Sequence, residues 1–299
     1  MADHVRPQWC AQFAGGVRML GIIGGTGLYA MAELRSPEAQ DVATPFGPPS
    51  APLIRGTLHG RQVAFLARHG LGHQLLPSEI NFRANIWALK SLGVRTVIGV
   101  SAVGSLREEI RPGELALPWQ YLDFTKGRRI GSFFGNGLVG HVSSAHPSCR
   151  ATAALIGRVA AAEGIALHAQ KTYACIEGPR LGTRAESLFL RGAGADLVGM
   201  TNVPEAFLAL EAQMGYCTVA VVTDYDCWLE DPSQHVSVDQ VLAEFRNNLA
   251  RVQRLLAQVV AQHEEDESRP CRHALRGALV TPRERMTAEQ RALVEMLLR

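Results

Sequence analysis

The sequence predicts an α/β fold, a single domain with three αβα layers around a central mixed β-sheet. Apolar, β-branched runs alternate with amphipathic helical patterns from residue 20 to about residue 260, as in chains that lay helices on both faces of a sheet. Several of these runs are apolar throughout, which is typical of strands buried on both faces. The chain has 299 residues, 47% of them hydrophobic, and is long enough to bury such a core.

The individual elements follow from these patterns in chain order. Strands are expected at 19–24, 52–60, 61–70, 95–104, 113–122, 171–178, 195–200 and 217–225. Helices are expected at 81–93, 151–164, 183–194, 204–215 and 238–262. Four of these helices end close to a glycine, a residue common just beyond helix C-termini. Two alternating runs meet at His59 and Gly60, which predicts a β-hairpin.

The two ends of the chain differ from this core. We expect residues 1–19 to form a flexible N-terminal extension and residues 20–262 to form the domain. Residues 263–299 are expected to form a charged linker and a helix, because Thr287 and Gln290 make a capping box before an apolar stretch. We expect this helix to pack on the core or on a neighbouring subunit.

Composition narrows the kinds of partner. The formal net charge is +2 and no Lys/Arg run carries interleaved aromatics, so a small-molecule ligand is expected and no nucleic acid. The longest apolar stretches are about 11 residues, short of the roughly 20 that span a bilayer, so no membrane partner is expected. The six cysteines are scattered singly, which predicts no metal site and a reducing, cytoplasmic location. The first 18 residues lack the apolar run of a signal peptide.

A glycine loop follows the first expected strand. Gly25, Gly27 and Ala30 match the G-x-G-x-x-A spacing, which brings backbone close to a pyrophosphate in dinucleotide-binding folds. However, prolines and the hairpin follow where that fold needs a crossover helix, and no acid closes a second strand about 20 residues further on. These departures disfavour a nicotinamide oxidoreductase, which stays an alternative.

Polar residues also follow other expected strands. Arg68 and His69 end one strand, where a guanidinium matches the oxygens of a tetrahedral anion. A surface arginine in a turn and a satisfied histidine are the alternative. Ser101 lies in a turn of small residues that either offers backbone N–H groups to the same anion or is simply a tight turn.

Asp224 and Asp226 follow the last expected strand, two positions apart. Two carboxyl groups held close together and away from water raise at least one pKa, which provides a general acid near neutral pH. An exposed acidic loop or an aspartate-capped turn is the alternative. Met200 and Thr201 by themselves fit an ordinary strand-to-helix connection. Several strand ends with polar or glycine-rich turns are nevertheless how an α/β sheet builds a site.

The motifs of the chain, taken in order, resemble one known family. Over about residues 20 to 260 they are "GIIGGTGL", "ARHGLGH", "NFRANIWALKSLG", "AVGSLREEIRPGEL", "IEGPR", "TRAES", "GMTNVPEA" and "TDYDCW". They resemble the trimeric purine nucleoside phosphorylase family, and within it the members that act on 5′-methylthioadenosine. Such enzymes cleave the N-glycosidic bond of a purine nucleoside with orthophosphate and use no metal and no redox cofactor. The resemblance implies a nucleoside phosphorylase-like fold and a homotrimer with active sites at subunit interfaces.

The resemblance also implies roles for individual residues. Asp224 is expected to protonate or hydrogen-bond N7 of the leaving purine, and Asp226 to accept from the 6-amino group. The other residues expected at the base are Leu181 and Thr223. Those expected at the ribose and methylthio groups are Met200, His73, His141, Val238 and Val241. Those expected at the phosphate are Thr26, Arg68, His69, Ser101, Ala102 (through its backbone) and Thr201.

The identity of the base depends on hydrogen-bond direction. Two aspartates facing a 6-oxopurine would set acceptor against acceptor, a mismatch that binding sites reject strongly, so adenine is the expected base. Leu181 stands where many methylthioadenosine phosphorylases have a phenylalanine, and Gly182 replaces the serine that commonly follows. This departure leaves methylthioinosine, inosine or guanosine as alternative substrates. A nucleoside-binding module without turnover is an alternative from another class.

Overall fold

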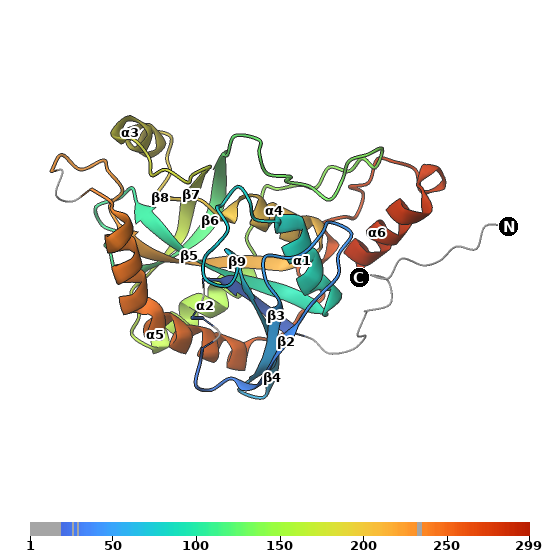
Figure 1. Ribbon diagram of the computed structural model, residues 1–299, viewed down its shortest axis with the longest axis horizontal. Helices are drawn as coiled ribbons and strands as arrows, with labels where there is room; N and C mark the ends of the chain where they lie inside the picture. Colours follow the sequence, from blue (N-terminus) through green and yellow to red (C-terminus); the bar gives the residue numbers. More distant parts are fainter. Residues whose placement is uncertain (1–18, 26, 29, 232–234) are drawn as a thin grey trace.

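The computed structural model describes residues 19–25, 27–28, 30–231 and 235–299 (Figure 1). The strands are β1 (Met19–Gly24), β2 (Arg35–Gln40), β3 (Leu53–Leu58), β4 (Arg61–Ala67), β5 (Val94–Ser105), β6 (Leu115–Phe124), β7 (Leu167–Ile176), β8 (Leu197–Gly199) and β9 (Gly215–Asp224). The α-helices are α1 (Phe82–Ser91), α2 (Arg150–Ala162), α3 (Arg184–Gly192), α4 (Asn202–Glu211), α5 (Val238–Gln262) and α6 (Ala288–Leu298). Two short 3₁₀-helices are η3 (Pro270–His273) and η4 (Arg283–Arg285).

The described strands form one mixed sheet, as the sequence predicts. Their order is β2-β3-β4-β1-β5-β8-β7-β6-β9, and β5 also pairs with β9 in parallel along most of its length. Because of this second pairing, β5, β8, β7, β6 and β9 form a closed ring of hydrogen-bonded strands. Strands β1, β4, β3 and β2 continue from the other side of β5 as an open sheet. The closure depends on contacts between residues more than 100 positions apart, so local patterns do not predict it.

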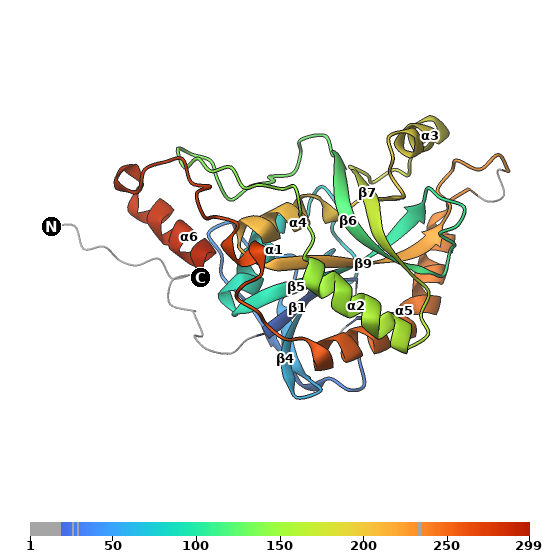
Figure 2. The same ribbon diagram turned by 180° about the vertical axis from the view of Figure 1, so that it is seen from behind.

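Helices cover both faces of the sheet, which confirms the three-layer expectation. Helices α1 and α4 lie over one face, and α2 and α5 lie over the other (Figures 1 and 2). Alternation along β1 assigns its side chains to these two layers. Met19 and Ile23 pack with α1 and α4, whereas Leu20 and Ile22 pack with α2 and α5. Strand β1 is therefore apolar throughout because it contributes to both cores.

The expected hairpin is confirmed, and one strand was missed. Leu58 pairs with Arg61 across the turn, and both turn residues have a positive φ, 49° at His59 and 76° at Gly60, as type I′ turns require. The missed strand is β2, which pairs antiparallel with β3 at the edge of the sheet. Strand β2 is exposed along nearly its whole length, so it carries no apolar alternation that sequence reading could detect.

The C-terminal segment packs on this chain's own core. Helix α6 starts with the expected capping box, in which Thr287 Oγ1 accepts from the Gln290 N–H at 3.1 Å and Gln290 Oε1 accepts from the Thr287 N–H at 2.9 Å. Met296 and Leu297 belong to the same buried cluster as α1 and α4. Among the described residues, no helix is both long and apolar enough to cross a bilayer.

Candidate active site

The site begins where β1 and β4 end beside the middle of β5. Strand β1 pairs in parallel with both β4 and β5, and Arg68 follows β4 directly. The Arg68 backbone N–H donates to the Gly24 carbonyl at 2.9 Å. Its guanidinium reaches both neighbouring strands, because Nη1 donates to the Val100 carbonyl at 2.8 Å and Nη2 donates to the Ile23 carbonyl at 3.3 Å. The glycine loop, Arg68 and β5 therefore meet at one edge of the sheet.

Glu205 of α4 holds the guanidinium of Arg68. Arg68 Nε donates to Glu205 Oε2 at 2.7 Å and Nη2 donates to Glu205 Oε1 at 2.8 Å, and the side chains are only 2% and 0% exposed. Burial opposes the charged form of Arg68, but the Glu205 carboxylate raises the pKa of the guanidinium above its ordinary value. With two carbonyls also bound, one N–H of Nη1 is left without a partner among these contacts. Arg68 is therefore a fixed, charge-compensated donor.

His69 presents a neutral imidazole beside Arg68. Its Nδ1 lies 2.9 Å from the Leu75 carbonyl, which can only accept, so Nδ1 carries the proton and Nε2 has a free lone pair. Burial and the nearby Arg68 charge lower the pKa of His69 to about 4. The exposed ring of His73 stacks on it, with ring centroids 4.2 Å apart. The structure thus brings His69 and His73 together, as expected for neighbouring parts of one site.

Two hydroxyl groups come from the elements that hold this arginine, β5 and the start of α4. The turn expected at Ser101 is wrong, because Ser101 lies within β5 and pairs with Ala220 of β9. Ser101 is buried, and its Oγ lies 3.4 Å from Asn202 Oδ1, a distance that leaves the hydroxyl only weakly engaged. Thr201 precedes α4, and its backbone N–H donates to the Tyr173 hydroxyl at 3.3 Å. Thr201 Oγ1 is buried and has no hydrogen-bond partner within the described part of the chain. A buried polar atom of this kind requires an explanation, and a bound oxyanion would provide one.

The carboxyl pair lies at the end of β9. Thr223 Oγ1 donates to Asp224 Oδ2 at 2.7 Å, and the Asp226 backbone N–H donates to Asp224 Oδ1 at 2.7 Å. Asp224 is 2% exposed and Asp226 is 6% exposed, and burial raises the pKa of each carboxyl group above its ordinary value. The interpretation as an exposed acidic loop is therefore wrong. Thr223 contacts the carboxylate of Asp224, and its expected contact with the base stays a prediction.

Two glycines lie against the carboxyl pair, one of them tightly. A Cβ at Gly104 of β5 would lie 2.8 Å from Asp224 Oδ1, so only a glycine permits this approach. A Cβ at Gly182 would lie 3.7 Å from Asp226 Oδ2, which shows that the loop before α3 reaches Asp226. Leu181 is half-buried in the same loop. The motifs around Ser101, Leu181 and Asp226 are thus neighbours in space.

Arg68, Glu205, His69, Ser101, Thr201, Asp224 and Asp226 are called the cluster below. The remaining expected residues are less closely joined to it. Met200 lies against Gly178, where a Cβ would be 2.5 Å from the methionine sulfur. Ala102 is half-buried in β5 opposite Val221. Val238 is 62% exposed at the start of α5, and Val241 is half-buried one turn later. Thr26 lies outside the described residues, so its expected phosphate contact stays a prediction.

His141 belongs to a segment held by the C-terminal tail. Its backbone N–H donates to the Ala278 carbonyl at 2.8 Å, and the Val280 N–H donates to the Val139 carbonyl at 2.9 Å. The side chain of His141 is exposed. The tail that binds this segment leads into α6, which lies at the opposite end of the molecule from α3 (Figures 1 and 2).

Several residues of the cluster were not expected from the sequence. Glu205 carried a usable signal, because a carboxylate within the apolar helix "NVPEAFLALE" must find a buried partner. Arg129 pairs with Glu177 at 3.1 Å, with both side chains almost fully buried, and it also donates to the Met200 carbonyl at 2.6 Å. No sequence pattern near Arg129 indicated that it is buried or that it contacts Glu177 and Met200. Within the described residues, no group of three or more His, Cys, Asp or Glu side chains could hold a metal ion.

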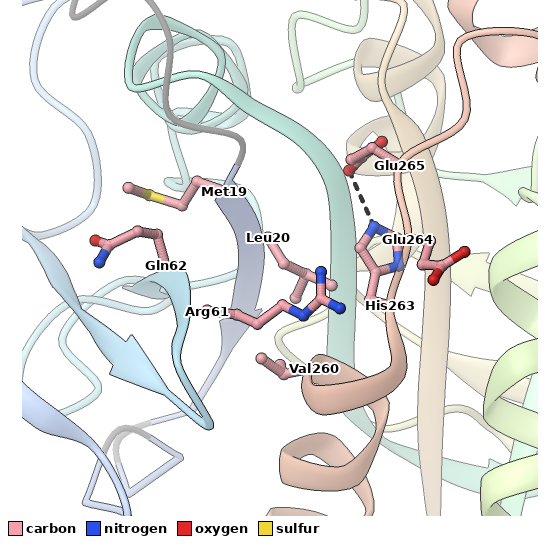
Figure 3. Close-up of a pocket in the computed structure, with 8 residues that line it drawn as sticks. All are labelled: Met19, Leu20, Arg61, Gln62, Val260, His263, Glu264 and Glu265. Atoms are coloured by element: carbon pink, nitrogen blue, oxygen red, sulfur yellow. Dashed lines mark hydrogen bonds and ion pairs between the residues drawn. The ribbon is translucent and has the colours of Figure 1, made fainter.

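A separate cavity of about 340 Å³ lies at the opposite ends of β1 and β4. Its lining residues are Met19, Leu20, Arg61, Gln62, Val260, His263, Glu264 and Glu265 (Figure 3). His263 Nε2 pairs with Glu265 Oε1 at 3.0 Å beside it. Arg61 begins β4 whereas Arg68 follows its end, so the cavity does not include the strand ends that carry the cluster.

Known proteins share both the sequence and the fold. A model of the phosphorylase superfamily matches residues 19–261. The chain is 43% identical over 281 residues to S-methyl-5′-thioadenosine phosphorylase of Geobacter sulfurreducens, covering 94% of this chain and 98% of that protein. It is 47% identical over 261 residues to the protein of the same name from Thermofilum pendens, covering 87% and 98%.

Solved structures show the same similarity. A methylthioadenosine phosphorylase from an antarctic soil metagenomic library superposes with a TM-score of 0.88 at 45% identity, over 95% of this chain and 99% of that one. The methylthioadenosine phosphorylase of Schistosoma mansoni in complex with adenine superposes with a TM-score of 0.82 at 34% identity, over 88% and 99%.

Proposed function

The chain belongs to the phosphorylase superfamily, and from that premise we propose that it cleaves 5′-methylthioadenosine with orthophosphate. The products are adenine and 5-methylthioribose 1-phosphate. The buried carboxyl pair at the end of β9 carries this proposal, since Asp224 and Asp226 have raised pKa values and can exchange hydrogen bonds with a purine. The names of the relatives, which are 43% and 47% identical, support the same substrate.

The residues of the cluster suit the chemistry of this cleavage. A phosphate oxygen attacks C1′ as the C1′–N9 bond breaks, and the bonding electrons leave with the purine. Asp224, whose pKa is raised by burial, is the acid that protonates or hydrogen-bonds N7, and Asp226 accepts from the 6-amino group. Phosphate also offsets the positive charge that develops on the sugar, so positioning and electrostatics provide much of the rate.

The phosphate would bind at the strand edge around Arg68. The free Nη1 N–H of Arg68 and the hydroxyls of Ser101 and Thr201 are donors there. Neutral His69 can accept a hydrogen bond from the P–OH group of hydrogen phosphate through Nε2. Orthophosphate is a co-substrate in this scheme, and the enzyme needs neither a metal nor a redox cofactor.

The 5′ side of the nucleoside would lie against Met200, His73, His141, Val238 and Val241. His141 is anchored to the tail that leads into α6, away from α3 and the loop beside Asp226. This separation supports a homotrimer in which a neighbouring subunit completes each site. We place the enzyme in the cytoplasm and assign it no nucleic-acid or membrane partner.

A comparison of four substrates tests this function. Release of base from methylthioadenosine, adenosine, methylthioinosine and inosine is measured with and without phosphate. We expect phosphate-dependent turnover that favours the two adenine nucleosides. A preference for methylthioinosine or inosine would show that the substrate is a 6-oxopurine nucleoside and not methylthioadenosine. Nucleoside binding without any turnover would indicate a binding module.

Methylthioinosine is the second candidate substrate because Leu181, at the loop beside Asp226, offers no aromatic face to the base. The variant Asp224→Asn decides how the base is recognised. An amide can donate to O6, so this variant should shift the preference toward 6-oxopurines. Unchanged selectivity would contradict the assignment of Asp224 to N7 and the six-position edge.

A further inference from the structure

A chain of hydrogen bonds connects residues that are proposed to bind the phosphate. Tyr216 donates to Glu205 Oε1 at 2.8 Å, and Thr218 Oγ1 donates to the Tyr216 hydroxyl at 3.1 Å. Asn202 Nδ2 donates to Thr218 Oγ1 at 2.8 Å, and Ser101 Oγ lies 3.4 Å from Asn202 Oδ1. The chain therefore joins Arg68, through Glu205, to Ser101.

The four linking side chains are buried too deeply to contact solvent. Glu205, Asn202 and Thr218 are 0% exposed, and Tyr216 is 1% exposed. The three close donors point the same way, from Asn202 through Thr218 and Tyr216 to the Glu205 carboxylate. The Ser101 hydroxyl, 3.4 Å from Asn202 Oδ1, is only weakly engaged and stays available as a donor to the phosphate. A buried hydrogen-bond network of this kind holds its members in one arrangement.

The backbone of β5 is shaped to admit this network. A Cβ at Gly99 would lie 2.6 Å from the Tyr216 hydroxyl and 3.2 Å from Glu205 Oε1. The phenol and the carboxylate thus lie directly against a glycine, two positions before Ser101. Replacement of that glycine would push both groups away from Arg68.

The carboxylate determines the plane of the guanidinium. A bidentate pair holds Nε and Nη2 on one edge, and the Val100 carbonyl takes one hydrogen of Nη1. The orientation of the remaining N–H of Arg68 Nη1 is therefore fixed by the other hydrogen bonds of the guanidinium. Because the Arg68 charge is already balanced by Glu205, anion recognition at this point depends on the direction of that donor more than on net charge.

We propose that Glu205 and Tyr216 are positioning residues for phosphate, which orient the guanidinium of Arg68 toward the co-substrate without touching it. The inference rests on the proposed phosphorolysis and concerns only its phosphate half. It predicts that damage to the network weakens phosphate binding and leaves the nucleoside half unaffected.

Two substitutions probe the network, and a third is their control. Tyr216→Phe removes the donor to Glu205, and Thr218→Val removes the donor to Tyr216 while keeping the shape of the side chain. Thr152→Val makes the same change at an equally buried threonine of α2, which is 1% exposed and donates to Cys149 Sγ. Steady-state kinetics are measured with phosphate and methylthioadenosine varied separately.

The expected result is a split between the two substrates. In Tyr216→Phe the KM for phosphate should rise about three- to tenfold, the effect of losing one hydrogen bond of ordinary net strength. Thr218→Val should show a smaller rise. The KM for the nucleoside should stay unchanged in both, and saturating phosphate should restore kcat. Thr152→Val should match the wild-type protein in all three constants.

Other outcomes overturn the proposal. An unchanged phosphate KM in Tyr216→Phe, or an equal rise in Thr152→Val, would remove the positioning role. A wild-type protein without turnover would instead refute the proposed function. In that case phosphate binding by calorimetry still compares the same variants, so the two failures can be distinguished. Glu205→Gln should weaken phosphate binding further, and protection against thermal unfolding by added phosphate reports this even at low activity.

Discussion

The two ends of the proposed site both bury charged groups, but they treat the charge differently. At the phosphate end, Arg68 and Glu205 form a bidentate ion pair with almost no exposure. At the base end, Asp224 and Asp226 are equally buried, and within the described residues neither forms an ion pair. Asp224 receives only hydrogen bonds, from the hydroxyl of Thr223 and the backbone of Asp226.

This difference determines what each end can do. A compensated ion pair keeps its charge at every ordinary pH and holds its atoms in place, which suits the binding of a co-substrate. A carboxyl group buried without a cation has a raised pKa, which favours the protonated form that a general acid needs. Burial therefore produces a fixed donor at one end of the site and a proton donor at the other.

The largest effect is expected at the base end. Asp224→Ala removes the proposed proton donor, and turnover of methylthioadenosine should fall by about 10² to 10⁴, the usual contribution of a general acid. Adenine release is measured at saturating phosphate. Circular dichroism should show an intact fold, and retention of wild-type turnover would exclude Asp224 from the catalytic role.

At the phosphate end, breaking the ion pair should cost stability. Arg68→Met leaves Glu205 buried without its partner, and the free energy of unfolding should fall by about 3–5 kcal/mol. The double variant Arg68→Met/Glu205→Met should recover most of this loss, because no charge stays buried. Urea unfolding of both variants measures it. Equal stability of the single variant and the wild-type protein would show that the pair does not compensate Glu205.

A smaller change tests the geometry of the carboxyl pair. In Gly104→Ala the new methyl group would lie 2.8 Å from Asp224 Oδ1, so the carboxyl group must move. We expect kcat to fall about tenfold to a hundredfold, as misplaced catalytic groups typically cause. Gly182→Ala is the matched control, since its Cβ would keep an ordinary 3.7 Å contact with Asp226. Equal activity of the two variants would contradict the tight fit at Gly104.

The smallest effect concerns pH and stability. The raised pKa of Asp224 favours the protonated folded state, so the group contributes stability below its ordinary pKa of 3.8 and loses it as pH rises through the raised value. In Asp224→Asn the side chain is neutral at every pH, so this variant does not lose stability as the carboxyl group of the wild-type protein ionises. Its melting temperature relative to the wild-type protein should therefore rise from acidic to neutral pH. Thermal scans of both proteins measure these melting temperatures. A difference between them that does not change with pH would mean that burial does not raise the pKa of Asp224.

Much of the fold could be read from local sequence. The apolar runs gave the positions of eight of the described strands, and the motifs at Arg68 and Asp224 indicated residues that the structure places at strand ends. Ser101 lies within β5 and not in the turn that the sequence predicted. Strand β2 could not be found this way, because an exposed edge strand lacks an apolar face. Tyr216 was also missed, since it is an ordinary residue of its strand until a partner distant in sequence is known. Glu205 carried the signal of a carboxylate within an apolar helix, but the sequence does not show which residue is its partner.

The sequence by itself determined the α/β class, the hairpin at His59, the capping box at Thr287 and the kinds of residue at each strand end. These features depend on neighbours a few positions apart, so periodicity and turn chemistry encode them. Only the tertiary structure decided the ring formed by β5 and β9, the pairing of Arg68 with Glu205 and the burial of the two aspartates. Ion pairing and desolvation depend on which distant segments meet, and no local pattern carries that information.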